Sequence, residues 1–238
     1  MNMILLEQSD FVGPQRVELR GRRHDHLAGI LHACAGDELK VGLLDGKSGM
    51  GHVVEIGEGR SLLEVNLTQD PVAKHPIMLV LALPRPPVFR RLLSAVTALG
   101  IERVCVIHSA RVEKGYWNSP SLTEEAVHQA VVLGLEQAGD TLRPEISFHE
   151  RFWVFAKEEL PQLMDGRTAL LAHPDEGKPC PTTVSSPVIL AVGPEGGFVD
   201  DEVAYFKEIG FQAVHLGKRI LRVETAVQAL IGRLLPLC

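Results

Sequence analysis

A single carboxylate lies among glycines in the stretch AVGPEGGFVDDE, residues 191–202. Glycine-rich loops between a strand and a helix usually bind phosphate through their backbone N–H groups. A carboxylate within about 4 Å of a phosphate would repel it in a desolvated pocket. The side chain of Glu195 therefore favours a ligand that offers hydroxyls, an ammonium group or another cation.

Two common nucleotide motifs are missing from the chain. Neither the dinucleotide fingerprint G-x-G-x-x-G after the first strand of residues 71–238 nor the phosphate loop G-x-x-x-x-G-K-[ST] occurs. S-adenosylmethionine suits the loop better, because it carries a ribose diol, an α-amino group and a sulfonium but no phosphate. A tight turn with an exposed Glu195 remains the alternative, since glycine also supplies positive φ angles.

A second stretch that could do chemistry is LGKRILRVETA, residues 216–226, which opens the last expected helix. Helix N-termini expose backbone N–H groups and the positive end of the helix dipole. Glu224 and Thr225 fall in the first turn, where capping alone explains them. Arg222 and Glu224 are only two residues apart, so they cannot lie on the same face of a helix. One side chain can therefore face a ligand while the other contacts the rest of the protein.

Basic residues gather in three runs although the net charge is −6. The runs are residues 16–26, 85–91 and 217–222, and each could be only a solvated face. Together they indicate a basic surface patch that a polyanion such as RNA could contact, since phosphate contacts need lysine and arginine. The candidates for RNA contact are Arg20, Arg22, Arg23, Arg85, Arg90 and Arg91.

Composition indicates an ordinary globular protein, with 45% hydrophobic and 23% charged residues among 238. The longest apolar runs are far below the roughly 18 residues that cross a bilayer, and residues 1–10 do not resemble a signal peptide, so we expect no membrane association and a cytoplasmic location. The cysteines, Cys34, Cys105, Cys180 and Cys238, form no C-x-x-C pair and are expected to be buried free thiols. His24 and His26 lack a third ligand at a recognisable spacing, so we expect no metal.

Two styles of secondary structure divide the chain. Short strands rich in valine and leucine are expected at 39–45, 51–56 and 61–67, with a linker at 68–76. From 77 onward, buried strands at 77–83, 103–109, 168–173, 187–193 and 211–217 alternate with helices at 88–100, 121–139, 200–210 and 222–235. Asp200 is the expected cap of the third helix. This alternation predicts an α/β fold with a parallel sheet covered on both faces, and ligands bind such sheets beyond the carboxyl ends of the strands.

The motifs GPEGGF and LGKRILRVETA, about 20 residues apart, resemble the two C-terminal motifs of the 16S ribosomal RNA (uracil-N(3))-methyltransferase family, in the SPOUT superfamily. The likeness extends more loosely to residues 24–49, which resemble that family's N-terminal barrel, and to residues 135–146. The alternation alone would predict an open doubly wound sheet, because true knots are rare.

The resemblance implies a different architecture: a PUA-like, RNA-binding β-barrel over residues 1–70, and a SPOUT methyltransferase domain with a C-terminal trefoil knot over residues 71–238. It also implies a homodimer. The implied reaction transfers a methyl group from S-adenosylmethionine, which leaves as S-adenosylhomocysteine, to nitrogen 3 of a uridine in 16S ribosomal RNA. The implied substrate is the RNA in the assembled small subunit.

The resemblance also assigns the site. It leaves Arg222 and Glu195 as the ionisable candidates near the reacting centre. Our hypothesis is that both are catalytic, with Arg222 stabilising charge on a uracil carbonyl and Glu195 orienting cofactor or substrate. The cofactor would lie against three strand-end loops and one helical residue: Leu171, Ala172, His173, Gly193, Pro194, Glu195, Gly196, Gly197, Leu216, Gly217, Ile220, Leu221, Arg222 and Thr225.

Departures from the family pattern fall on the presumed RNA side. They include Ala95 and Ala98 where relatives carry lysine and glutamate, Asp140 where arginine is common, and His32 in the barrel segment. Two alternatives therefore stay open. One is a SPOUT enzyme that modifies another RNA or a ribose 2′-hydroxyl, and the other is a non-catalytic module that binds RNA or cofactor.

Overall fold

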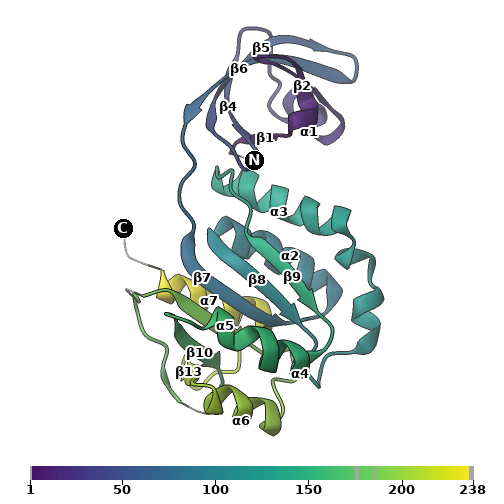
Figure 1. Ribbon diagram of the computed structural model, residues 1–238. Coiled ribbons are helices and arrows are strands. Elements are labelled where there is room, and N and C mark those ends of the chain that lie inside the picture. Colours follow the sequence, from purple (N-terminus) through teal and green to yellow (C-terminus); the bar gives the residue numbers. More distant parts are fainter. Residues whose placement is uncertain (1, 175–176, 185, 236–238) are drawn as a thin grey trace. The chain divides into compact units, whose positions relative to one another are not determined.

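The computed structural model describes residues 2–174, 177–184 and 186–235, and its chain divides into two compact units. Unit 1 contains Met1–Ala73 and Val132–Arg143, and unit 2 contains Lys74–Val131 and Pro144–Cys238. Unit 1 is therefore built from two separate pieces of sequence. The helix α3 (Glu124–Ala138) runs through the second boundary (Figure 1).

Unit 1 holds a six-stranded sheet in the order β1-β4-β5-β6-β3-β2. β1 pairs parallel to β4, and the other pairs are antiparallel. The strands are β1 (Ile4–Leu6), β2 (Phe11–Gly13), β3 (Arg16–Arg20), β4 (Glu38–Leu43), β5 (Ser48–Gly57) and β6 (Arg60–Gln69), and the short helices are η1 (Gln8–Asp10), α1 (Gly21–Asp25) and η2 (His26–Ile30).

Alternation along these strands separates the core from the solvent, because successive side chains point to opposite faces. In β6, for example, Leu63 and Val65 are buried while Glu64 is not. Leu63 and Val65 of β6 belong with Val17 and Leu19 of β3 to the hydrophobic core of unit 1.

Residues 132–143 complete unit 1 through polar contacts. The backbone carbonyl of Glu136 accepts the N–H groups of Asn2 and Met3 at 3.0 and 3.2 Å. Thr141 donates its hydroxyl to the carbonyl of Gly46 at 2.6 Å and is 2% exposed. A segment synthesised about 60 residues after the sheet thus forms part of its packing.

Unit 2 holds a seven-stranded, wholly parallel sheet in the order β11-β13-β10-β12-β7-β8-β9. Helices cover both faces (Figure 1), which explains why the central strands are buried along nearly their whole length. The strands are β7 (His75–Ala82), β8 (Ile101–Ile107), β9 (Glu145–His149), β10 (Thr168–Ala172), β11 (Lys178–Pro179), β12 (Val188–Val192) and β13 (Gln212–His215). The helices are α2 (Pro86–Ala98), η3 (Lys114–Asn118), η4 (Pro120–Leu122), α4 (Phe152–Val154), η5 (Phe155–Glu159), α5 (Leu160–Leu163), α6 (Asp200–Glu208) and α7 (Val223–Leu234).

The order of the strands reverses beside β7. β8 and β9 follow β7 on one side, whereas β12 pairs with β7 on the other side and separates it from β10. The carboxyl ends of β7 and β12 are therefore neighbours, with Val192 in register with Leu81. This reversal is the kind of place where open parallel sheets bind ligands.

The α/β class, the parallel sheet and the strands and helices expected after residue 77 are confirmed. Three details were wrong. Val199 rather than Asp200 is the N-cap of α6, the segment between β6 and β7 is only residues 70–74, and Cys34 is exposed. The sequence patterns also missed β1, β2 and β3, which are only three to five residues long. β1 pairs with the distant β4 and β3 with the distant β6, whereas β2 and β3 pair with each other.

Candidate functional site

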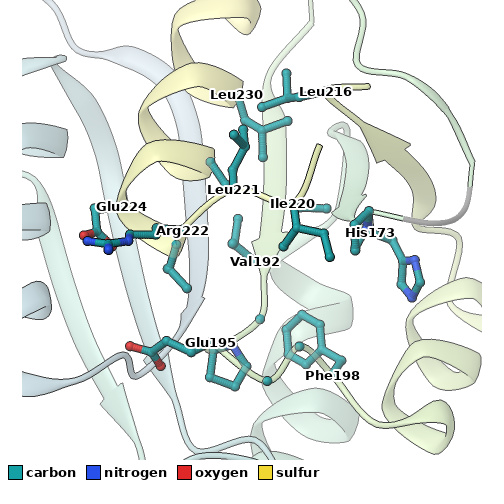
Figure 2. A pocket seen from close by; sticks show the side chains of 18 of the residues that line it. His173, Val192, Glu195, Phe198, Leu216, Ile220, Leu221, Arg222, Glu224 and Leu230 are labelled. Atoms are coloured by element: carbon teal, nitrogen blue, oxygen red, sulfur yellow. The ribbon is translucent and has the colours of Figure 1, made fainter. Parts of the chain in front are cut away.

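A cavity of about 750 Å³ opens at the carboxyl ends of β10, β12 and β13 in unit 2. In Figure 2 the segment with Leu221 and Arg222 lies above the loop with Glu195 and Phe198. Most of the residues expected to bind a cofactor line this cavity: Ala172, His173, Gly193, Pro194, Glu195, Gly196, Gly197, Leu216, Gly217, Ile220, Leu221 and Arg222.

Leu171 and Thr225, which were expected at the site, are not among the lining residues. Leu171 is fully buried within β10, where its side chain contributes to the packed sheet. Thr225 is exposed on the first turn of α7. The cavity wall is formed by the strand-end loops together with residues of α2, α7 and the ends of the strands, and Leu171 and Thr225 lie outside it.

The loop after β12 is shaped by its glycines. A Cβ atom at Gly193 would lie 3.0 Å from the backbone nitrogen of Phe198 and 3.1 Å from Gly197, so only glycine fits there without a shift. Gly197 has φ +71°, which L side chains rarely adopt, and its N–H donates to the carbonyl of Pro194 at 2.8 Å. The loop is a tight backbone cradle.

Glu195 connects this loop to the one after β7. Its Oε1 atom accepts the backbone N–H of Arg85 at 3.1 Å, although the side chain is exposed. The hydroxyl of Tyr116 donates to the carboxylate of Glu113 at 2.9 Å, and the Arg85 side chain interacts electrostatically with Tyr116. Desolvation and the Glu113 carboxylate raise the pKa of Tyr116, and the Arg85 guanidinium opposes them.

The loop after β13 forms the opposite wall. Gly217 has φ +106° and no atom within 4 Å of a Cβ placed there, so the space beside it is open. Among the described residues, the backbone N–H groups of Ile220 and Leu221 have no hydrogen-bond partner. The side chain of Ile220 is 83% exposed. These features provide free donors beside an apolar surface.

The cavity gathers arginines without carboxylate partners. Within the described part of the chain, Arg85, Arg91, Arg219 and Arg222 form no ion pair, and all four line the cavity. Figure 2 places Arg222 with Glu195 and Glu224 on one side of the cavity and His173 on the other. These four guanidinium groups are therefore available to an anion without the loss of an ion pair.

The arginines of unit 1 have partners. Arg23 donates from both terminal nitrogens to Asp10, at 2.5 and 2.6 Å, and Asp10 is 8% exposed. Arg22 pairs with the buried Glu136 at 2.9 Å, and Arg20 with Glu18 at 2.7 Å. Of the other residues expected to contact RNA, Arg85 and Arg91 line the cavity, whereas Arg90 is exposed on α2 outside its lining.

Sequence reasoning missed two arginines of the cavity, Arg111 and Arg219. Arg219 lies inside the motif LGKRILR, so its place in the motif was a usable signal. Arg111 follows β8 by four residues, at another carboxyl end of the same sheet. A search of every strand end, rather than only the glycine-rich ones, would have found it.

His24, one of the two histidines in residues 24–26, is buried, and its Nδ1 atom lies 2.8 Å from the hydroxyl of Ser61. Across residues 2–174, 177–184 and 186–235 there is no group of three or more histidine, cysteine or acidic side chains placed to hold a metal ion. No helix in those ranges has the length and apolar character needed to cross a membrane.

Comparison with known proteins identifies the family. The model of a family described as an RNA methyltransferase domain matches residues 71–235. A ribosomal RNA small subunit methyltransferase E from Treponema pallidum is 31% identical, over 96% of this chain and 88% of its own. The chain belongs to the ribosomal RNA small subunit methyltransferase E family. Another member, from Borreliella burgdorferi, is 25% identical over 95% of this chain and 93% of its own.

Two solved structures of methyltransferases share the fold. The protein from Neisseria gonorrhoeae, solved bound to S-adenosyl methionine, has a TM-score of 0.74 at 24% identity and covers 97% of this chain and 95% of its own. A putative methyltransferase from Legionella pneumophila, solved with bound S-adenosyl methionine, has a TM-score of 0.73 at 20% identity, over the same shares. Both units therefore have counterparts in one chain of known structure.

Proposed function

We propose that this chain is an S-adenosylmethionine-dependent methyltransferase that acts on nitrogen 3 of a uridine in 16S ribosomal RNA. Membership of the methyltransferase E family supports the reaction. The observation that carries the assignment of the site is the cavity between the loops after β10, β12 and β13, where the two family motifs meet. Transfer to that nitrogen leaves S-adenosylhomocysteine and requires loss of the imide proton.

The cavity suits S-adenosylmethionine, which supplies an electrophilic methyl group on a sulfonium when bound. The open space at Gly217 and the free N–H groups of Ile220 and Leu221 suit an adenosine held by backbone atoms. The turn at Gly193–Gly197 lines the cavity, and the carboxylate of Glu195 within it favours a cation over a phosphate. Leu171 and Thr225 would act only behind this surface.

Arg222 and Glu195 are the proposed catalytic pair. Arg222 is the N-cap residue of α7 and has no ion pair among the described residues, so its guanidinium is available to a uracil carbonyl that gains negative charge. Glu195 uses one carboxylate oxygen on Arg85 and orients the cofactor or the base with the other. The uridine must leave its stack to expose nitrogen 3, and alignment in the cavity supplies much of the rate.

We propose that RNA approaches along Arg85, Arg91, Arg219 and Arg222, where the charges are unpaired. Arg90 extends this surface on α2. Unit 1 would add a PUA-like barrel that binds RNA, with Arg20 exposed on it and with Arg22 and Arg23 holding its structure.

The remaining proposals concern the whole assembly and rest on the family resemblance. They are a trefoil knot formed by the C-terminal segment, a homodimer, the assembled small subunit as substrate, no metal requirement and a cytoplasmic location. The insertion of β12 between β10 and β7 is compatible with a knotted thread. Light scattering of the purified protein would test the dimer directly.

The decisive experiment incubates the protein with S-adenosylmethionine and either naked 16S RNA or small subunits that lack the modification. Nucleosides from the digested RNA are then separated and analysed by mass spectrometry. 3-Methyluridine is the expected product. A methyl group on ribose would instead support the alternative substrate, and binding of cofactor without any product would support a non-catalytic module.

A further inference from the structure

Arg111 lies at the junction of the cavity with the loop after β12. Its guanidinium Nη1 donates to the carbonyl of Gly196 and, at 3.4 Å, to that of Phe198. Arg111 itself belongs to the segment between β8 and η3, so the two hydrogen bonds join residues 85 and 87 positions apart. The contact links the glycine loop to a strand end on the other side of β7.

The stem of Arg111 packs against the same loop. A Cβ atom at Gly196 would lie 3.1 Å from Cδ of Arg111 and 3.6 Å from its Cβ. Gly196 does not need a positive φ, since the structure gives that conformation to Gly197 instead. The absence of a side chain at residue 196 thus makes room for Arg111.

The carboxylate of Glu202 also joins the segment after β8 to the segment after β12. Glu202 of α6 is 2% exposed and accepts the backbone N–H of Ala110 at 2.7 Å and that of Val199 at 3.1 Å. The neighbours Ala110 and Arg111 therefore join the loop through complementary groups, one to a buried acid and one to backbone carbonyls. Hydrogen bonds to charged groups contribute more than neutral ones.

We propose that Arg111 is a positioning residue that fixes the conformation of the cofactor loop. The inference rests on the proposed function of the cavity. Three glycines within residues 193–197 give the free loop many conformations, and ordering them on binding would weaken affinity. Because Arg111 holds the carbonyls of Gly196 and Phe198 in advance, the loop keeps the shape that receives the ligand.

The test measures binding of S-adenosylhomocysteine by calorimetry in the full chain. Arg111→Met keeps an apolar stem but removes the donors, and we expect about 10- to 100-fold weaker binding. Arg111→Lys retains the charge without the planar fork and should recover only part of the affinity. Arg151→Met, which changes an exposed arginine of unit 2 outside the cavity, is the matched control and should bind as the wild type does.

Hydrogen–deuterium exchange separates positioning from general stability. Without ligand, Arg111→Met should accelerate exchange at residues 193–198 and leave β7 protected. Unchanged affinity in Arg111→Met, or faster exchange throughout unit 2, would overturn the inference. A folded wild-type protein that does not bind S-adenosylhomocysteine would instead overturn the proposed function of the cavity.

Discussion

The carboxylate of Glu195 joins two strand-end loops through the backbone of Arg85. This contact gives a physical answer to why an acid stands among glycines. One carboxylate oxygen ties the loop after β12 to the loop after β7, and the proposed function assigns the other to the ligand. The same residue would therefore shape the cavity and act in it.

Substitution at Arg222 tests its proposed role in charge stabilisation. Arg222→Lys should lower the single-turnover rate of methyl transfer, by up to about 100-fold, because lysine keeps the charge but lacks the planar, preorganised fork of the guanidinium. S-adenosylhomocysteine should still bind, because the contacts proposed for its adenosine come from backbone N–H groups and not from Arg222. Full activity of the lysine variant would rule out the guanidinium as the stabilising group.

Substitution at Gly196 tests the loop itself. Gly196→Val places a branched side chain against Arg111, so calorimetry should detect no binding of S-adenosylhomocysteine. Gly115→Ala is the control, because a Cβ atom there meets nothing within 4 Å and the residue lies in the same unit. Normal binding by Gly196→Val would show that the loop is only a turn.

The arginines of unit 1 differ in whether the carboxylate that each pairs with is buried or exposed. Arg23 joins α1 to the buried Asp10 of η1, with side-chain exposures of 20% and 9%. Arg16 and Glu64 also pair, but both are about half exposed. When one partner of a buried ion pair is removed, the other charge stays buried without a partner, which is costly. When one partner of an exposed pair is removed, water solvates the remaining charge and little stability is lost.

Arg23→Met should therefore lower the free energy of unfolding by about 3 kcal/mol, measured by urea denaturation. Arg16→Met should change it by less than about 1 kcal/mol. If Arg23→Met kept wild-type stability but weakened RNA binding, Arg23 would belong to the RNA surface and not to the structure of unit 1.

The sequence was most informative where contacts are local or where residues stand in a motif. Apolar runs and glycine stops predicted β7, β12 and α7, because each pattern reflects burial of that element alone. The pairing of β12 with β7 could not be predicted in this way. It depends on contacts between residues more than 100 positions apart.

Part of the cavity lining could also be predicted from the sequence, and part could not. The two motifs contain nearly all of its glycines, yet they gave no indication that Arg111 completes the loop. The residue carries no local signature, and only the adjacency of β8 to β7 brings it near Gly196. Likewise, the carboxylates beside Arg22 and Arg23 become partners only through the folding of unit 1.

Buried cysteine thiols make the free energy of unfolding of the whole protein depend on pH. Burial raises the pKa of Cys105, which lies within the central sheet of unit 2. The unfolded chain therefore releases this proton first as the pH rises. The contribution of the protonated Cys105 thiol to the free energy of unfolding is complete below about pH 8.5, the usual cysteine pKa. It declines as the pH rises from there toward the higher pKa of Cys105 in the folded protein.

Denaturation at pH 7.5 and pH 10 provides the measurement. The wild type should lose more stability between these values than Cys105→Ala does, by up to about 1.4 kcal/mol for each pH unit in the window. Other groups that titrate there are common to both proteins and cancel in the difference. Equal losses would mean that Cys105 ionises in the folded protein as readily as in the unfolded chain.

The division of unit 1 into two pieces of sequence affects the order in which a ribosome can produce a folded protein. Residues up to 73 leave the ribosome before residues 132–143, which complete their packing through Glu136 and Thr141. At common elongation rates the delay is roughly 4 to 14 s. During that time the sheet of unit 1 is without its last segment, while the first strands of unit 2 are already being made. Because residues 132–143 lie beyond the midpoint of the 238-residue chain, a nascent chain exposes an incomplete unit 1 until more than half of the protein has been made.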